Sequence, residues 1–189
     1  LGRGGGAVEG GVAVGGGGVG AGVGLGFAGA SEVATEAAQG DVCTAANDND
    51  PGQVVVSGHR AAVTRALDIA KEKGAKRAVL LPVSAPFHCP LMQPAADVMA
   101  QALAEVSIQA PAVPLVANVR AAAVQDPDEI RDLLVTQVTG SVRWRESVMW
   151  MAGQGVTEIW EIGAGKALSG MIRRIERSIA CKNIGVAAD

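Results

Sequence analysis

The distribution of glycine is the feature that most constrains how this chain can fold. The sequence contains 26 glycines, of which 15 fall in the first 30 residues and 11 in the other 159. Such a glycine-rich segment buries few side chains and loses much conformational entropy on ordering. We therefore expect residues 1–25 to be disordered, or to derive from a GC-rich gene read in the wrong frame and joined to the true frame around residues 22–30. No chemistry is assigned to them.

From Ser31 onward, helical and extended patterns alternate, which predicts an α/β protein. Over residues 26–86 the order helix–strand–helix–strand indicates a small α+β subdomain, ferredoxin-like and missing its first strand. Its expected elements are a helix over 31–39 with Ser31 as N-cap, a turn over 47–52, a strand over 54–56, a helix over 63–70 closed by Gly74, and a strand over 77–83.

Residues 87–180 read as α/β layers typical of part of a parallel sheet, with 181–189 as a tail. Asp126 followed by Pro127 predicts a helix start, since aspartate caps a helix and proline fits its first position. The expected elements are helices over 91–106, 127–139, 141–152 and 166–175 and strands over 113–119 and 156–162.

Composition excludes several classes of function. The net charge is −3 and the sequence has no run of lysine or arginine, so it offers no electrostatic basis for binding nucleic acid or an anionic membrane. Three cysteines are scattered without metal-ligand spacing, and no apolar run reaches the roughly 18 residues that span a bilayer. We expect a soluble cytoplasmic protein that binds no metal.

The two histidines narrow the search for a general base. His59 stands at a helix start, where a solvent-facing capping role is ordinary. His88 lies where a strand joins a helix, which is where α/β enzymes place their chemistry, although a buried structural histidine is also compatible with this position. Adjacent side chains diverge in direction, so Cys89 is expected to pack rather than to pair with His88. Gly163–Lys166 lacks the full spacing of a phosphate-binding loop, so ATP binding is not expected.

Four separated stretches together resemble one family. They are ANDNDPGQVVVSG at 46–58, LPVSAPFHCPLM at 81–92 and PLVANV at 114–119. The fourth joins Gln137 and VRW at 142–144 to EIGAGKALSG at 161–170. In order and spacing these stretches resemble malonyl-CoA:acyl-carrier-protein transacylases over roughly residues 25–180. The resemblance implies a partial α/β-hydrolase-like acyltransferase domain plus the ferredoxin-like subdomain.

The family resemblance also implies a ping-pong mechanism, in which a serine takes the malonyl group from CoA and passes it to acyl-carrier protein in fatty acid biosynthesis. His88 matches the general base of that reaction, and Gln137 matches the residue whose backbone carbonyl orients it. Phe87 matches a pocket position whose bulk favours malonyl over branched acyl groups. Three further positions match residues near the cleft with an architectural role: Asn49, Gln53 and Asn118.

The sequence departs from this pattern in ways that bear on activity. The Gly-His-Ser-x-Gly motif of the nucleophile is absent. Arg3 stands roughly where the malonyl-binding arginine is expected, but its surroundings do not match, and Ala164 replaces a usual proline. We therefore expect a C-terminal portion of the enzyme that is inactive alone, needs no cofactor, and belongs to a family whose members are usually monomeric.

Two alternatives stay open. One is an acyltransferase fragment of a polyketide synthase, which shares the histidine motif; the closing residues 179–189 favour a stand-alone protein instead. The other is a non-catalytic remnant that binds acyl-carrier protein or CoA.

Overall fold

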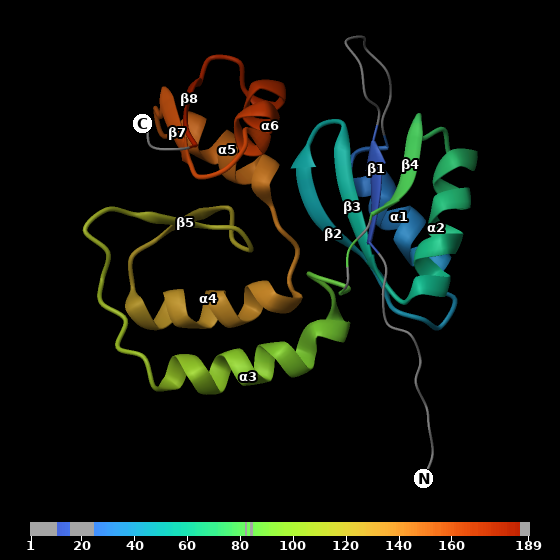
Figure 1. Ribbon diagram of the computed structural model, residues 1–189, viewed down its shortest axis with the longest axis horizontal. Coiled ribbons are helices and arrows are strands. Elements are labelled where there is room, and N and C mark those ends of the chain that lie inside the picture. The colour runs from blue at the N-terminus through green and yellow to red at the C-terminus, as the bar shows by residue number, and fades with distance from the viewer. Residues whose placement is uncertain (1–10, 16–24, 82, 84, 186–189) are drawn as a thin grey trace.

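A computed structural model describes residues 11–15, 25–81, 83 and 85–185, and they form a mixed α/β fold. Two units follow one another along the chain (Figure 1). The N-terminal unit contains the elements up to residue 81, and the C-terminal unit contains those from residue 90 onward. The remainder of the glycine-rich segment, residues 1–10 and 16–24, lies outside the described residues, as does Arg3.

The N-terminal unit is a four-stranded antiparallel sheet with strand order β2-β3-β1-β4. Its elements are β1 (Gly11–Gly15), α1 (Gly26–Ala38), β2 (Cys43–Asp50), β3 (Gln53–Gly58), α2 (Arg60–Glu72) and β4 (Arg77–Leu81). The expectation that this unit lacks its first strand is wrong. Gly11–Gly15 pairs with both β3 and β4, so part of the segment expected to be disordered completes the sheet.

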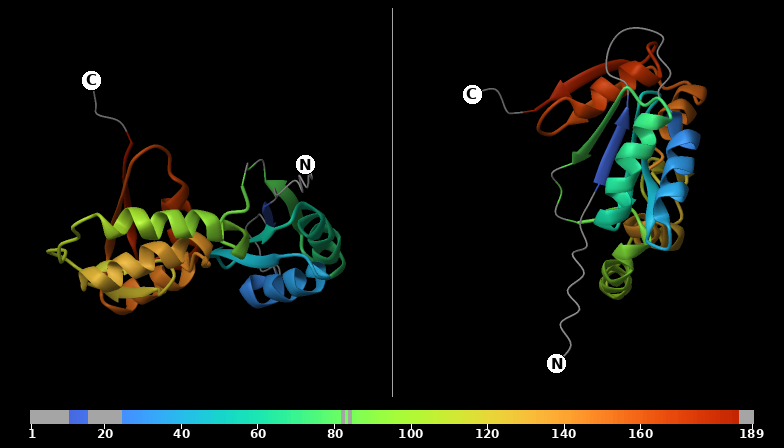
Figure 2. Two further views of the ribbon diagram at one scale, coloured as in Figure 1. Left: turned by 90° about the horizontal axis from the view of Figure 1, so that it is seen from below. Right: turned by 90° about the vertical axis from the view of Figure 1, so that its right-hand side faces the viewer.

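Both helices of this unit lie side by side against one face of the sheet (Figure 2). The core between them consists of small side chains, which recur at three- and four-residue spacing and let helices approach closely. The fully buried members include Ala30, Val33 and Ala34 on α1 and Ala62, Val63 and Ala66 on α2, with Val54 and Val56 beneath them on β3.

Two further sequence expectations in this unit are wrong. Helix α1 begins at Gly26, five residues before the expected N-cap, and the hydroxyl of Ser31 donates to the carbonyl of Phe27 inside the helix. The expected turn over 47–52 is confined to the two residues Pro51 and Gly52, because strand β2 continues to Asp50. Asp48 and Asp50 lie in a strand here because their carboxylates bond to arginines of the C-terminal unit.

The C-terminal unit carries two small sheets and four α-helices within the described residues. Its elements are η1 (Pro90–Met92), α3 (Gln93–Ala104), β5 (Leu115–Ala117), β6 (Ala122–Val124), α4 (Pro127–Thr139), α5 (Trp144–Gly153), β7 (Glu158–Ile162), α6 (Ala167–Ile175) and β8 (Ala180–Ile184). Strands β5 and β6 are antiparallel, whereas β7 and β8 are parallel. Helices α3 and α4 lie next to each other (Figure 2).

The capping prediction for α4 is confirmed, since the amide of Glu129 donates to the Asp126 carboxylate at 2.8 Å. Other element boundaries in this unit differ from those expected from the sequence. The strand expected over 113–119 is only three residues long and is followed by β6, which was not expected. Residues beyond 180, expected to be a tail, form β8 through Ile184. In the described ranges, no helix combines the length and apolar character needed to cross a membrane.

Candidate functional site

The site is built around His88, which lies between β4 and η1. Its Nδ1 atom is 3.0 Å from the backbone carbonyl oxygen of Gln137, near the end of α4. A carbonyl oxygen can only accept, so Nδ1 is the donor in this hydrogen bond. The neutral ring then keeps its lone pair on Nε2, which is the atom left to accept a proton from another group. The structure thus brings together the two residues expected to act as a pair.

The carbonyl of Gln137 is available because α4 ends two residues later. The last carbonyls of a helix have no partner within it and must be satisfied elsewhere. Gly140 donates to Thr136 at 2.8 Å, and the chain then leaves the helix. Val142 bonds instead to β2, where its amide donates to Ala46 and its carbonyl accepts from Asp48, both at 2.8 Å. This explains why α5 begins at Trp144 rather than at the expected residue 141.

The backbone at His88 has φ = +59°, a left-handed conformation that residues with a Cβ atom adopt infrequently. The following residue holds the turn in place. Cys89 is fully buried, and its thiol donates to the carbonyl of Pro86 at 3.1 Å. Burial also raises the pKa of the Cys89 thiol, which keeps it protonated. Cys89 therefore packs, as the sequence predicts, and supports the turn that carries the imidazole.

The other predicted site residues are spread more widely. Phe87 adjoins His88, and 49% of its surface is exposed. Asn118 lies in the turn after β5, where its carbonyl accepts from the amide of Arg143 at 3.1 Å. Asn49 donates to the side chain of Gln53 at 3.3 Å across the β2–β3 turn. None of the side-chain hydrogen bonds found in the described residues joins Asn49, Gln53 or Asn118 to the imidazole of His88.

The second histidine, His59, does not have the solvent-facing capping role expected for it. His59 occupies the N-cap position of α2, but its side chain makes no capping hydrogen bond. Its Nδ1 instead accepts from the amide of Val42 at 2.8 Å, which ties the start of α2 to the residue before β2. This is a structural contact within the N-terminal unit.

Two ion pairs with buried carboxylates, which the sequence did not predict, join the two units. The carboxylates of Asp48 and Asp50 on β2 are each only 1% exposed. Asp48 accepts from Nε of Arg145 on α5 at 3.0 Å, and Asp50 accepts from Nε of Arg174 on α6 at 2.9 Å. In each ion pair, Nη2 of the arginine lies 2.8 Å from the carboxylate. Buried charges need such partners. These pairs hold β2 beside the segment that follows Gln137. Their only signal in the sequence is aspartate at alternate positions.

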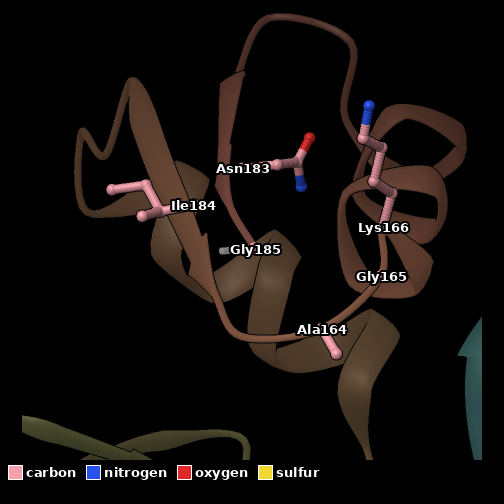
Figure 3. A pocket seen from close by; sticks show the side chains of 6 residues that line it. All are labelled: Ala164, Gly165, Lys166, Asn183, Ile184 and Gly185. Carbon is pink, nitrogen blue, oxygen red and sulfur yellow. The ribbon is translucent and has the colours of Figure 1, made fainter. Parts of the chain in front are cut away.

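An open pocket of about 710 Å³ lies where β7 and β8 end (Figure 3). It is lined by Ala164, Gly165 and Lys166 ahead of α6 and by Asn183, Ile184 and Gly185 at the end of β8. The Glu161 carboxylate accepts from the amides of Leu168 and Ser169 at 3.0 and 2.8 Å. Hydrogen bonds from Ser169 above all lower the pKa of Glu161. The first turn of α6 therefore already holds an anion from within the chain. No group of three metal-binding side chains gathers in the described part of the molecule.

Comparison with known proteins gives this arrangement its context. No protein-family model matches the chain. The malonyl CoA-acyl carrier protein transacylase of Escherichia coli K12 is 49% identical over 145 residues, covering 77% of this chain and 47% of that protein. The acyl-carrier-protein S-malonyltransferase of Burkholderia pseudomallei superimposes with a TM-score of 0.88 at 41% identity, covering 96% of this chain and 56% of that chain.

A further solved structure holds a malonyl-transacylase in complex with its type II polyketide synthase acyl-carrier protein. It matches with a TM-score of 0.88 at 36% identity, over 96% of this chain and 56% of that chain.

The solved structures that share this mixed α/β fold include an acyl-carrier-protein S-malonyltransferase, so the fold is one found among acyltransferases. More narrowly, the chain belongs to the malonyl CoA-acyl carrier protein transacylase family. It spans about half the length of the curated relatives it matches.

Proposed function

We propose that this chain is the C-terminal portion of a malonyl-transferring acyltransferase and supplies its general base, His88. The observation that carries the proposal is the 3.0 Å contact between His88 Nδ1 and the Gln137 carbonyl oxygen. A backbone carbonyl holds the ring in one tautomer, so that Nε2 is presented as the proton acceptor. Family membership supplies the reaction in which such a base is needed.

The role of the imidazole follows from the weakness of an alcohol as a nucleophile at neutral pH. In the proposed reaction, Nε2 accepts the proton of a serine hydroxyl as its oxygen attacks the malonyl thioester. The proton then passes to the sulfur of CoA as the carbon–sulfur bond breaks. In the second half, Nε2 accepts the proton of the acyl-carrier thiol, which attacks the ester, and returns it to the serine oxygen. The sequence contains no Gly-His-Ser-x-Gly motif, so the serine must come from outside these 189 residues.

The two units fit the parts that the family resemblance implies. The N-terminal unit has the order β-α-β-β-α-β with strand order β2-β3-β1-β4, which supports a ferredoxin-like subdomain. The C-terminal unit, with its parallel pair β7–β8, corresponds to part of the α/β-hydrolase-like domain. Phe87, beside the base, is assigned to the acyl pocket, where its bulk would favour malonyl over branched acyl groups. Asn49, Gln53 and Asn118 are assigned architectural roles near the cleft.

The proposed substrates are malonyl-CoA and the thiol of acyl-carrier protein, in fatty acid biosynthesis. The names of the curated relatives and the solved complex with an acyl-carrier protein support this assignment. All three cysteines in the described residues carry free thiols, which suits a reducing cytoplasm.

A single-chain chimera tests the proposal. Residues 26–180 would replace the matching part of the E. coli relative, which supplies the remaining half of that protein in the same polypeptide. Malonyl transfer from malonyl-CoA to acyl-carrier protein is expected, and it should be lost when His88 is changed to alanine. A chimera that folds but shows no transfer, or one in which His88→Ala keeps full activity, would contradict the proposal.

The isolated chain separates this function from that of a non-catalytic remnant. Incubated with labelled malonyl-CoA, it should form no covalent adduct detectable by intact-protein mass spectrometry. Titration of the chain with acyl-carrier protein tests the alternative. Saturable binding without any acyl transfer would identify the chain as a non-catalytic remnant that binds acyl-carrier protein.

A further inference from the structure

Strand β2 is an edge strand of the N-terminal sheet, and it lies on the side of that sheet nearest the C-terminal unit (Figure 1). Its pairing with β3 shifts register between Ala45 and Asn47. A shift of this kind leaves one residue unpaired in the ladder. Here that residue is Ala46, whose carbonyl accepts instead from the amide of Val142 at 2.8 Å. The irregular edge of β2 therefore holds a segment from outside its own sheet.

The segment held there is residues 140–145, which leads out of α4 and into α5, and we call it the exit segment. The carbonyl of Val142 accepts from the amide of Asp48 at 2.8 Å, which completes a parallel bridge to β2. The hydroxyl of Ser141 donates to the carbonyl of Ala45. Backbone and side-chain hydrogen bonds thus fasten the exit segment to the N-terminal unit.

The carboxylate of Asp48 adds a charged contact to this attachment. Asp48 is buried, and its carboxylate accepts from Nε of Arg145, in the first turn of α5, at 3.0 Å. Because a buried carboxylate needs a cationic partner, Asp48 keeps Arg145 against β2. The amide of Arg143 donates to the carbonyl of Asn118 at 3.1 Å, so the exit segment is also held by the turn after β5.

The exit segment begins three residues after Gln137, whose carbonyl oxygen lies 3.0 Å from Nδ1 of His88. The chain is tightly packed where it leaves α4. A Cβ atom added to Gly140 would approach the side chain of Val119 to 3.0 Å. Such packing transmits small shifts, because close-packed groups cannot deform independently. A displacement of Val142 from β2 should therefore move the last turn of α4, and with it the carbonyl that orients the imidazole.

We propose that Asp48 is a positioning residue for His88. It acts through Arg145 and the exit segment, which keep the Gln137 carbonyl within hydrogen-bonding reach of the imidazole. The inference rests on the proposed function only in treating His88 as a base. The N-terminal unit thereby sets the tautomer of that base through contacts made with the C-terminal unit.

Nitrogen-15 NMR of the imidazole rings in the full chain tests this proposal, because a ring nitrogen changes its chemical shift when it carries a proton. Spectra are recorded at about pH 8, above the ordinary imidazole pKa of about 6.5. His88 should carry its proton on Nδ1, which donates to the Gln137 carbonyl. His59 should carry its proton on Nε2, since its Nδ1 accepts from the amide of Val42. His59 is therefore an internal reference for the opposite tautomer.

Asp48→Asn should change the ratio of the His88 tautomers by about fivefold towards Nε2–H, the factor that one hydrogen bond of ordinary net strength contributes. Ser141→Ala removes only a hydroxyl contact, so it should shift the ratio in the same direction by a smaller factor, and it tests the exit segment if Asp48→Asn does not fold. Asp50→Asn is the matched control. Its carboxylate is equally buried and pairs with Arg174 on α6, outside the exit segment, so the His88 ratio should not change.

An unchanged His88 ratio in both Asp48→Asn and Ser141→Ala would overturn the positioning role. An equal shift in Asp50→Asn would overturn it too, because loss of either ion pair would then act by loosening the whole chain. A wild-type His88 that carries its proton on Nε2 would contradict both this inference and the proposed function. A shift confined to the Asp48 and Ser141 variants supports the positioning role even if the single-chain chimera transfers no malonyl group, a result that would count against the proposed function alone.

Discussion

The Nδ1 atom of His88 lies 3.0 Å from the carbonyl oxygen of Gln137, a residue 49 positions further along the chain. This contact uses a carbonyl that α4 leaves unpaired at its end, and the chain beyond it is held against β2 by Val142. The orientation of the imidazole therefore depends on where a helix stops and on what captures the segment after it.

Replacing His88 with alanine in the single-chain chimera should lower kcat for malonyl transfer by about 10²- to 10⁴-fold, the usual contribution of a general base. His59→Ala is the matched control. It removes the acceptor for the Val42 amide, so it should cost about 1–2 kcal/mol of unfolding free energy while leaving kcat nearly unchanged. Steady-state kinetics and urea denaturation measure the two effects. A comparable loss of kcat in both variants would show that His88 acts only through structure.

The variant Asp48→Asn should destabilise the chain by about 2–3 kcal/mol, because it leaves the guanidinium of Arg145 facing a neutral group at a buried position. Partial exposure of Arg145 brings this cost below the roughly 3–5 kcal/mol of a fully buried pair. Asp128→Asn breaks a surface pair with Arg131 and should change the free energy of unfolding by less than about 0.5 kcal/mol. Equal shifts in the urea midpoint would refute the distinction.

Burial raises the pKa of the Cys43 thiol from 9.0 to about 11. Between these values the unfolded chain loses this proton before the folded chain does, so stability is intact below pH 9 and falls as the pH rises towards 11. The expected loss by pH 11 is about 2 kcal/mol. Other groups also titrate there, so the quantity to measure is the difference from Cys43→Ala in denaturation at pH 8 and pH 11. An unchanged difference across this range would show that the thiol is not shielded.

A side chain at position 58 should be tolerated poorly. A Cβ atom added to Gly58 would overlap the carbonyl of Val42, which already accepts from the amide of His59 at 2.8 Å. Gly58→Ala should therefore cost about 3 kcal/mol or more. Gly153, the last residue of α5, has open space around it and no positive φ, so Gly153→Ala should add about 0.5–1 kcal/mol. Thermal unfolding distinguishes the two, and a destabilising Gly153→Ala would contradict the reasoning.

Local rules predicted several elements well. Asp126 and Pro127 define the start of α4, because capping and a fixed proline φ act within one turn. The spacing of Val63, Ala66, Leu67 and Ala70 predicts one face of α2 in the same way, and three of the four are fully buried while Leu67 is partly buried. The position of His88 at a strand–helix junction could also be recognised from the sequence, and the family resemblance paired it with Gln137.

The tertiary structure decided what depends on distant partners. Asp48 and Asp50 favour a turn locally, yet they lie in a strand because arginines 97 and 124 residues away neutralise their buried charge. Gly11–Gly15 gains its order from pairing with β3 and β4, and β8 from pairing with β7. The sequence by itself thus determined the helices and several of the strands, and it singled out His88 as the candidate base. The register of the strands and the anchoring of that base were decided by contacts between segments far apart in the chain, because burial and pairing there outweigh local preference.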